Sequence, residues 1–264
     1  MAHGQRADSF PPLIFQTWKS KDAMPGHFAR WSESLRRLNP DYAYVLWDDA
    51  DNRGFIATHH PWFCAIYDAY PREIYRVDAV RYFFLYQFGG VYADMDTECL
   101  RPLQPLFHSG DVWLGRMGHD RTFAHSIPNA IMASRPRQAF WLLVIALLVE
   151  NAHTLRDRTP PVGPETMTGP ILLKRAYDLY VGAERGRVRA MIEATAARLP
   201  ASLQPRTGSS QVRLLEPDVW YPIDWSNIIH LRLSRETVDY PLSRTLTRWL
   251  FPRSYLVTFW THSW

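Results

Sequence analysis

The stretch of residues 71–96 constrains the fold of this chain more than any other part of its sequence. Apolar residues recur in it at intervals of three and four positions, which predicts a helix that ends at Gly89-Gly90. The six residues that follow read as a strand, with Asp94 and Asp96 on one side of the pleat. A helix, a glycine turn and a strand in succession indicate an α/β fold with two carboxylates at a strand end.

The rest of the chain continues the α/β pattern. We predict further strands at residues 13–18, 42–47, 112–116, 129–133 and 212–215, and helices at residues 26–38, 138–151, 171–180 and 188–197. The first three of these elements in chain order form a β-α-β unit, and strand ends in such units commonly border a ligand crevice.

Composition narrows the class of protein. With 264 residues, 47% of them hydrophobic, the chain can bury a core without disulfides or metal, and Cys64 and Cys99 are expected to be free thiols because they lack ligand spacing. The net charge of +4 comes from scattered Arg, so we expect no nucleic-acid partner. The first ten residues lack a secretory signal and the longest apolar run is too short to span a bilayer, so we expect a cytoplasmic protein, with peripheral contact to the inner face of a membrane left open.

The paired aspartates carry the chemistry. Hard cations such as Mn²⁺ or Mg²⁺ prefer carboxylate oxygens, and two Asp separated by one residue present both carboxylates to one point. Asp78, Arg81 and Tyr82 fall on one face of the predicted helix. Taken alone, the D-x-D tripeptide more often marks a solvated turn, and the Asp78–Arg81 spacing also fits a plain salt bridge. His59, His60 and His119 lack ligand spacing and are expected at the surface.

Several motifs in order make the chain resemble a known family. The run from Asp78 through Arg81-Tyr82 and Gly89-Gly90 to Asp94-Met95-Asp96 closely resembles the DXD-containing sugar-binding region of glycosyltransferase family 32. That family includes inositol phosphoceramide mannosyltransferases and bacterial capsule enzymes. Shorter similarities are Ile14-Phe15-Gln16-Thr17-Trp18-Lys19, with Phe where the family commonly has His, Asn39-Pro40-Asp41-Tyr42, Leu46-Trp47-Asp48-Asp49 at the end of the second strand, Ser134-Arg135-Pro136, Thr168-Gly169-Pro170 and His262-Ser263-Trp264.

The resemblance implies a GT-A fold, a Rossmann-like mixed sheet flanked by helices. It implies one domain over residues 1–264, with a donor-binding half at 11–100 and an acceptor half at 101–264 that ends in a lid. The implied catalytic residues are Asp78, Arg81, Asp94 and Asp96, and the implied ligands of Mn²⁺ or Mg²⁺ are Asp94, Asp96 and His262. The implied donor-binding residues are Gln16, Thr17, Trp18, Tyr82, Tyr92, Asn129 and Trp264.

The resemblance also implies a reaction, the retaining transfer of a hexose from a nucleotide sugar to a glycolipid or polysaccharide. GDP-mannose is favoured as donor by a small margin, while UDP-hexoses and UDP-N-acetylhexosamines remain open. Since no nucleophile is evident, we favour a front-face route in which the leaving phosphate takes the acceptor's proton. The aromatic, Arg-rich residues 245–264 are expected either to pack over the crevice or to touch a membrane. The rival hypotheses are a phosphoryl-transfer enzyme or metal-dependent hydrolase, and a non-catalytic carbohydrate-binding or membrane-surface module.

Overall fold

A mixed six-stranded sheet forms the centre of the fold. The computed structural model describes residues 9–224, 227 and 244–261. The strand order is β2-β1-β3-β6-β5-β7, and a separate two-stranded sheet pairs β4 with β8. The strands are β1 Leu13–Thr17, β2 Ala43–Trp47, β3 Gly90–Ala93, β4 Thr97–Cys99, β5 Val112–Gly115, β6 Ile131–Ser134, β7 Val212–Leu215 and β8 Leu256–Thr258.

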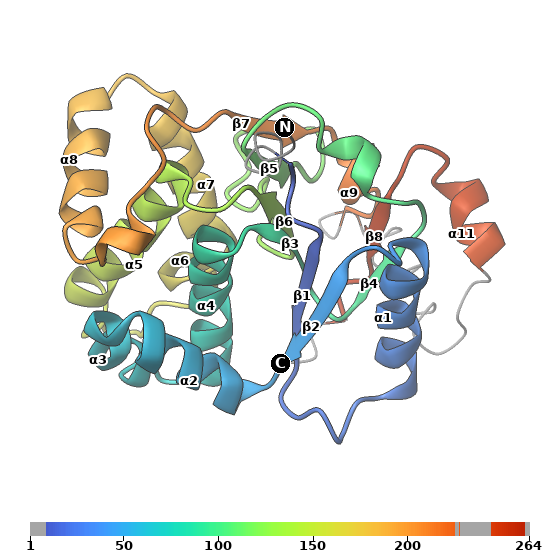
Figure 1. Cartoon of the computed structure of the whole chain (residues 1–264), viewed down its shortest axis with the longest axis horizontal. Helices are drawn as coiled ribbons and strands as arrows, with labels where there is room; N and C mark the ends of the chain where they lie inside the picture. The colour runs from blue at the N-terminus through green and yellow to red at the C-terminus, as the bar shows by residue number, and fades with distance from the viewer. Residues whose placement is uncertain (1–8, 225–226, 228–243, 262–264) are drawn as a thin grey trace, which may run out of the picture.

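Helices flank this sheet. Figure 1 shows α2 to α8 gathered on one side of β1 and β2, with α1, α9 and α11 on the other. The helices are α1 Gly26–Leu38, α2 Asp49–His59, α3 Cys64–Asp68, α4 Glu73–Gln87, α5 Ala139–Thr154, α6 Pro164–Met167, α7 Pro170–Val181, α8 Arg185–Ala196, α9 Pro217–Trp220 and α11 Arg244–Leu250. Short 3₁₀ turns are η1 Pro61–Phe63, η2 Gln104–Leu106 and η3 Ala201–Leu203. Within the described residues, no helix combines the length and apolarity needed to cross a bilayer.

The sheet directions bring several chain segments to one edge. β1 pairs in parallel with both β2 and β3, so the carboxyl ends of these three strands meet there. β6 runs antiparallel to β3, which places the residues that precede β6 at the same edge. A hydrogen bond of 2.8 Å from the Asp94 amide to the Ala130 carbonyl joins the two segments. The crevice expected at the strand ends therefore receives residues from both halves of the chain.

α4 lies inside the molecule. Every residue from 77 to 86 is buried, because the sheet covers one side of the helix and α5 packs on another. Gly89 and Gly90 follow with φ of +69° and +87°, and a Cβ on Gly90 would lie 2.5 Å from the Leu13 carbonyl oxygen. Only glycine fits this left-handed turn against β1, so the predicted glycine stop is confirmed.

Neighbouring side chains on β1 enter different cores. Ile14 packs on the α1 side of the sheet, with Leu35 in the same apolar cluster. Phe15 points the other way and stacks on Phe84 of α4, with ring centroids 3.7 Å apart. Phe15, which stands where the family commonly has His, is therefore a core residue. It does not lie at the edge of the sheet where the strands end.

Most predicted elements are confirmed within a few residues, and two details are wrong. β3 ends at Ala93, so Asp94 and Asp96 lie in the turn after the strand, which the Thr97 amide closes by donating to the Asp94 carbonyl at 3.1 Å. His60, expected at the surface, is fully buried, with Nε2 3.0 Å from Oε1 of Gln87. The absence of ligand spacing around His60 did not show that its imidazole would be buried in the core. The division into donor and acceptor halves stays a prediction.

Candidate active site

A cavity of about 250 Å³ opens at the edge where β1 and β3 end and β6 begins. Its lining contains all four of the predicted catalytic residues, Asp78, Arg81, Asp94 and Asp96. Asn129 and Trp260 also line it. Residues 182 positions apart in sequence, from Asp78 to Trp260, thus border one hollow.

Arg81 is the internal counterion of the cavity. Its side chain is 1% exposed, with Nη2 3.2 Å from Oδ1 of Asp78 and Nη1 3.2 Å from Oδ1 of Asp94. Nη1 also donates to the Asn129 carbonyl at 2.8 Å, and the guanidinium carbon lies 4.4 Å from the Tyr92 ring centre. The sequence left open whether Arg81 forms a plain salt bridge with Asp78 or lines the site. In the structure it does both.

Asp78 is held in one orientation by its neighbours. Asn129 Nδ2 donates to Oδ1 at 2.8 Å and Thr168 Oγ1 donates to Oδ2 at 3.3 Å. Tyr82 supports both partners, since its hydroxyl donates to the Thr168 carbonyl at 2.9 Å and accepts from Asn129 at 3.2 Å. Burial raises the pKa of the Asp78 carboxyl to about 6, although Arg81 opposes the shift.

Asp94 is positioned through both its side chain and its backbone. The Tyr92 hydroxyl donates to Oδ1 at 2.6 Å, and the Gln16 amide donates to the Asp94 carbonyl at 3.1 Å. Burial raises the pKa of the Asp94 carboxyl to about 6, with Arg81 lowering it and Asp96 raising it. Gln16 is fully buried behind the cavity and also accepts from Tyr44 at 2.8 Å, so in this structure it orients Asp94. Its direct contact with a donor stays a prediction.

Asp96 has one oxygen satisfied and one without a partner. Oδ2 accepts from the Thr261 amide at 2.8 Å and from the Thr261 hydroxyl at 3.2 Å. Oδ1 is buried and, within the part of the chain that the structure describes, has no hydrogen-bond partner. A buried carboxylate oxygen in this state is costly unless a ligand completes it.

The charge balance of the cluster fits a divalent cation. Three ionised carboxylates and one guanidinium leave two negative charges in excess. Mg²⁺ and similar ions are commonly bound through one or two carboxylates together with substrate phosphates. Among the described residues, no group of three or more His, Cys, Asp and Glu side chains is arranged to hold a metal. Asp94 and Asp96 therefore fit a site in which the protein supplies two carboxylates and the substrate supplies the other ligands. The predicted third ligand, His262, lies outside the described residues.

The segment that contains β8 completes the wall of the cavity. β8 pairs antiparallel with β4, so Thr258 lies opposite Thr97, directly after the turn that holds Asp96. Trp260 then reaches the cavity, and its Nε1 donates to the Ile223 carbonyl at 2.8 Å. Trp260 and Thr261 thus border the crevice, and contact of this segment with a membrane stays a prediction. Trp264 lies outside the described residues.

Thr17 and Trp18 line a neighbouring cavity of about 150 Å³. Ile74 borders both cavities, so they lie side by side along the start of α4. Asp49 and Glu73 also line the smaller cavity. Sequence reasoning had placed Asp49 in the acidic pair that ends the second strand, without a role, and had not singled out Glu73. It had also missed Thr261 as a partner of Asp96. No local pattern marks Thr261, because it lies 165 positions from the carboxylate it contacts.

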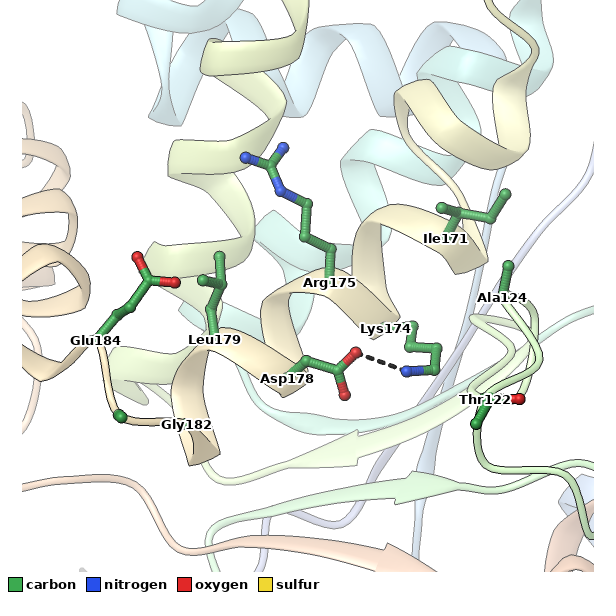
Figure 2. Close-up of a pocket in the computed structure, with 10 residues that line it drawn as sticks. Thr122, Ala124, Ile171, Lys174, Arg175, Asp178, Leu179, Gly182 and Glu184 are labelled. Carbon is green, nitrogen blue, oxygen red and sulfur yellow. Dashed lines mark hydrogen bonds and ion pairs between the residues drawn. The ribbon is translucent and has the colours of Figure 1, made fainter.

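A larger, open hollow of about 420 Å³ runs along α7 and has different chemistry (Figure 2). Its charged side chains are paired: Lys174 donates to Asp178 at 2.6 Å, and Glu184 lies 3.1 Å from Arg187. Since these charges are already neutralised at the surface, the hollow does not match the buried, charge-imbalanced cavity at the sheet edge. We therefore place the candidate site at the cavity around Arg81.

Comparison with known proteins gives a family match. Residues 25–114 match the family described as "Glycosyltransferase sugar-binding region containing DXD motif", a range that includes Asp78, Arg81, Asp94 and Asp96. The chain is 38% identical over 178 residues to inositol phosphoceramide mannosyltransferase 3 of Schizosaccharomyces pombe, covering 67% of this chain and 48% of that protein. It is 33% identical over 183 residues to mannosyl phosphorylinositol ceramide synthase CSH1 of Saccharomyces cerevisiae, covering 68% and 46%.

These relatives are longer proteins, and the chain spans about half of their length. A solved structure titled PaToxG Glycosyltransferase superposes with a TM-score of 0.52 at 16% identity, covering 74% of this chain and 78% of that one. That likeness confirms the predicted fold, a mixed sheet flanked by helices. By its sequence match and its fold, the chain belongs to the glycosyltransferase family defined by the DXD-containing sugar-binding region.

Proposed function

We propose that the protein is a retaining, metal-dependent transferase that moves mannose from GDP-mannose to a glycolipid. One observation carries the proposal: Asp78, Arg81, Asp94 and Asp96 are buried together around one cavity, with an unpartnered oxygen on Asp96. Glycosyl transfer from a nucleotide sugar leaves negative charge on the departing diphosphate, so such a site needs carboxylates that would hold a cation to offset that charge.

Mn²⁺ or Mg²⁺ would be held by Asp96, through its free oxygen, and by Asp94. When bound, the cation neutralises charge on the diphosphate as the sugar departs. Tyr92 and Arg81 keep Asp94 in place, and the Thr261 amide does the same for Asp96, so the two acceptors are oriented before a donor arrives.

Asp78 and Arg81 would bind the transferred sugar through hydroxyl groups. Both oxygens of Asp78 already accept hydrogen bonds, from Asn129 and Thr168, and Arg81 lies beside one of them. A carboxylate satisfied in this way is a weak nucleophile, which favours the front-face route over a covalent intermediate on Asp78. Glu165 is the other carboxylate of the lining that a covalent route would use.

The printed names of the relatives support the choice of sugar and acceptor. One of them is named inositol phosphoceramide mannosyltransferase 3 and another mannosyl phosphorylinositol ceramide synthase CSH1, so both names combine a mannosyl group with a ceramide lipid. We therefore place mannose first, with UDP-hexose or UDP-N-acetylhexosamine donors and a polysaccharide acceptor as the alternative.

A lipid acceptor requires access to a membrane surface, and α11 offers a contact. Leu246, Trp249 and Leu250 on this helix are 41%, 74% and 42% exposed, and the side chain of Arg248 is exposed among them. Exposed indole and leucine groups beside a cation suit the interface of an anionic bilayer. Nine residues lie between Leu250 and Trp260 of the cavity, so such a contact would hold a lipid acceptor near the site.

The test is donor hydrolysis across a panel of GDP- and UDP-sugars with Mn²⁺. We expect release of one nucleotide from the wild type and its loss in Asp96→Ala. Asp157→Ala is the matched control, because Asp157 is a fully exposed carboxylate whose side chain is 95% accessible. Equal turnover by Asp96→Ala, or no turnover of any donor by folded wild type, would contradict the proposal.

A further inference from the structure

The smaller cavity beside the candidate site has an unusual polar lining. Trp18 enters it from the end of β1, and Asp49 enters from the first turn of α2, immediately after β2. Lys19 also borders it. Since Ile74 lines this cavity and the cavity of Asp78 alike, one extended ligand can occupy both. An indole face, a carboxylate and an ammonium group thus surround a space next to the proposed sugar site.

Asp49 is the carboxylate of this lining that makes no bond to the described part of the protein. Its side chain is half-buried, and within the described residues its carboxylate makes no hydrogen bond or ion pair. Burial, together with Glu73 and Asp48, raises the pKa of the Asp49 carboxyl to about 6. The adjacent acids are occupied: Asp48 and Asp51 form a reciprocal cap on α2, and Asp51 also pairs with Lys21. Asp49 is therefore a poorly solvated acceptor that faces a cavity.

Glu73 differs from Asp49 although it lines the same cavity. Its carboxylate pairs with Arg76 one turn along α4 and is half exposed to solvent. A group that is already paired and hydrated gains little from a ligand. The recognition chemistry of the cavity thus rests on Asp49, and Glu73 serves as a natural control.

The edges of the nucleobases differ in what they offer a carboxylate. Guanine presents O6, N1–H and N2–H in a row, an acceptor followed by two donors. Uracil presents one N–H between two carbonyls, and a carboxylate facing that edge meets at least one repelling oxygen. A carboxylate accepts two parallel N–H bonds well, and a nearby ammonium group suits the O6 acceptor. Enzymes commonly read a base by hydrogen bonds to this edge while an aromatic side chain stacks on its face.

We propose that Asp49 reads the hydrogen-bonding edge of guanine and thereby selects a guanosine diphosphate sugar as the donor. The inference rests on the proposed function, since it assumes that a nucleotide sugar occupies both cavities. In the proposed complex Trp18 stacks on the base and Asp49 accepts from N1 and N2. Lys19, whose Nζ lies 5.7 Å from the centre of the Trp18 ring, donates to O6. Asp49 is thus a specificity-determining residue, and the reacting atoms lie in the neighbouring cavity.

The experiment uses the purified full chain with Mn²⁺ and measures dissociation constants of GDP, UDP and xanthosine diphosphate by calorimetry. Xanthine has a carbonyl in place of the 2-amino group of guanine. An amide at position 49 would donate to that carbonyl and accept from N1. We expect wild type to bind GDP about 10- to 100-fold more tightly than UDP or xanthosine diphosphate, because a bidentate pair discriminates by that factor. We expect Asp49→Asn to reverse the order of GDP and xanthosine diphosphate.

The control variant is Glu73→Gln, which should leave GDP affinity within about threefold of wild type. Reversed preference in Asp49→Asn supports the inference, and a structural role of Asp49 would not produce it. Tighter binding of UDP than of GDP by wild type overturns the inference alone and leaves the transferase proposal standing. An equal loss of all three nucleotides in Asp49→Asn also overturns it. If wild type binds none of them, the proposed function and this inference fall together.

Discussion

Nη1 of Arg81 lies 3.2 Å from Oδ1 of Asp94, and the two side chains are 1% and 9% exposed. The pair joins an internal helix to the turn after a central strand, and Arg81 also pairs with Asp78. Charges buried to this degree stabilise the fold only while they remain together, because each alone would be uncompensated. The cluster is therefore a structural element as well as the proposed sugar site.

Replacing Arg81 by Met should lower the free energy of unfolding by about 3–5 kcal/mol at neutral pH, because it strands two buried carboxylates. Urea unfolding followed by tryptophan fluorescence would measure the loss. Arg189→Met is the control, since Arg189 pairs with Glu193 at the surface, and it should cost well under about 1 kcal/mol. If the two variants lowered the free energy of unfolding equally, the buried ion pairs would contribute no more to stability than a surface pair.

Asp96→Asn should not lower the melting temperature of the metal-free protein, because it removes a buried charge whose Oδ1 lacks a partner. With Mn²⁺ at about 100 times its dissociation constant, wild type should gain about 2.7 kcal/mol of stability. The variant should gain far less. Thermal unfolding with and without Mn²⁺ compares the two proteins, and an equal shift in both would place the metal elsewhere.

Gly169→Ala should impair turnover more than stability. A Cβ at this position would lie 3.0 Å from Oδ2 of Asp78 and 3.0 Å from Cα of Glu165, so the carboxylate must move. We expect kcat to fall by about tenfold or more, since small displacements of a positioned group are costly. Gly186→Ala, on exposed α8 with no atom within 4 Å of the added Cβ, should keep full activity. Unchanged kcat in Gly169→Ala would indicate that the orientation of Asp78 is unimportant.

The stability of the protein should fall with acid through His60. Burial lowers the pKa of this imidazole to about 4, against about 6.5 in an unfolded chain. Between these values the unfolded state takes up the proton first, so the contribution is complete above pH 6.5 and is lost as the pH falls towards 4. The stability difference between wild type and His60→Gln should change by up to about 1.4 kcal/mol per pH unit in that window. A difference that stays constant from pH 7 to pH 4.5 would refute this assignment.

Trp249→Ser should weaken binding to vesicles of phosphatidylcholine and phosphatidylserine. An indole that is 74% exposed in solution can bury most of its apolar surface in a bilayer interface, so its loss should reduce partitioning by about tenfold or more. Val181→Ser removes an exposed apolar group from α7 and should leave partitioning unchanged. Co-sedimentation measures both, and equal behaviour of the two variants would argue against α11 as the contact.

The spacing of apolar residues predicted most of the main helices and strands. This worked because α1 buries one regular apolar face, and α4, α5 and the central strands are buried on nearly all sides. The predicted bounds of α1 and β7 agree with the structure. β4 and β8 were missed because each has only three residues and their pairing joins positions 97–99 to 256–258, a separation that no local pattern records. α2 was missed as well, although Asp48 and Asp51 form a capping box at its start.

The candidate site was predictable where its residues share one motif. Asp78, Arg81, Asp94 and Asp96 all fall within 19 positions, and the structure brings them together. Their supports come from elsewhere in the chain, as with Thr168 on Asp78 and Gln16 on Asp94. Gln16 was expected to contact a donor, which stays a prediction, and its bond to the Asp94 carbonyl could not be read from the sequence because the two residues lie 78 positions apart. The sequence placed Asp49 in the acidic pair at the end of a strand, and only the fold shows that it lines one cavity together with Trp18.

The hydrogen bond between Thr261 and Asp96 has a consequence for the order of folding. It spans 165 positions, so the entropy of closing a long loop opposes its formation until the central sheet is in place. A chain leaving the ribosome would carry all four residues of the charged cluster well before β8 is made. We expect the amide of Thr261 to gain protection from hydrogen exchange late in refolding, and to lose it early in local opening. The affinity of the site for cations would then report on the docking of a single short strand.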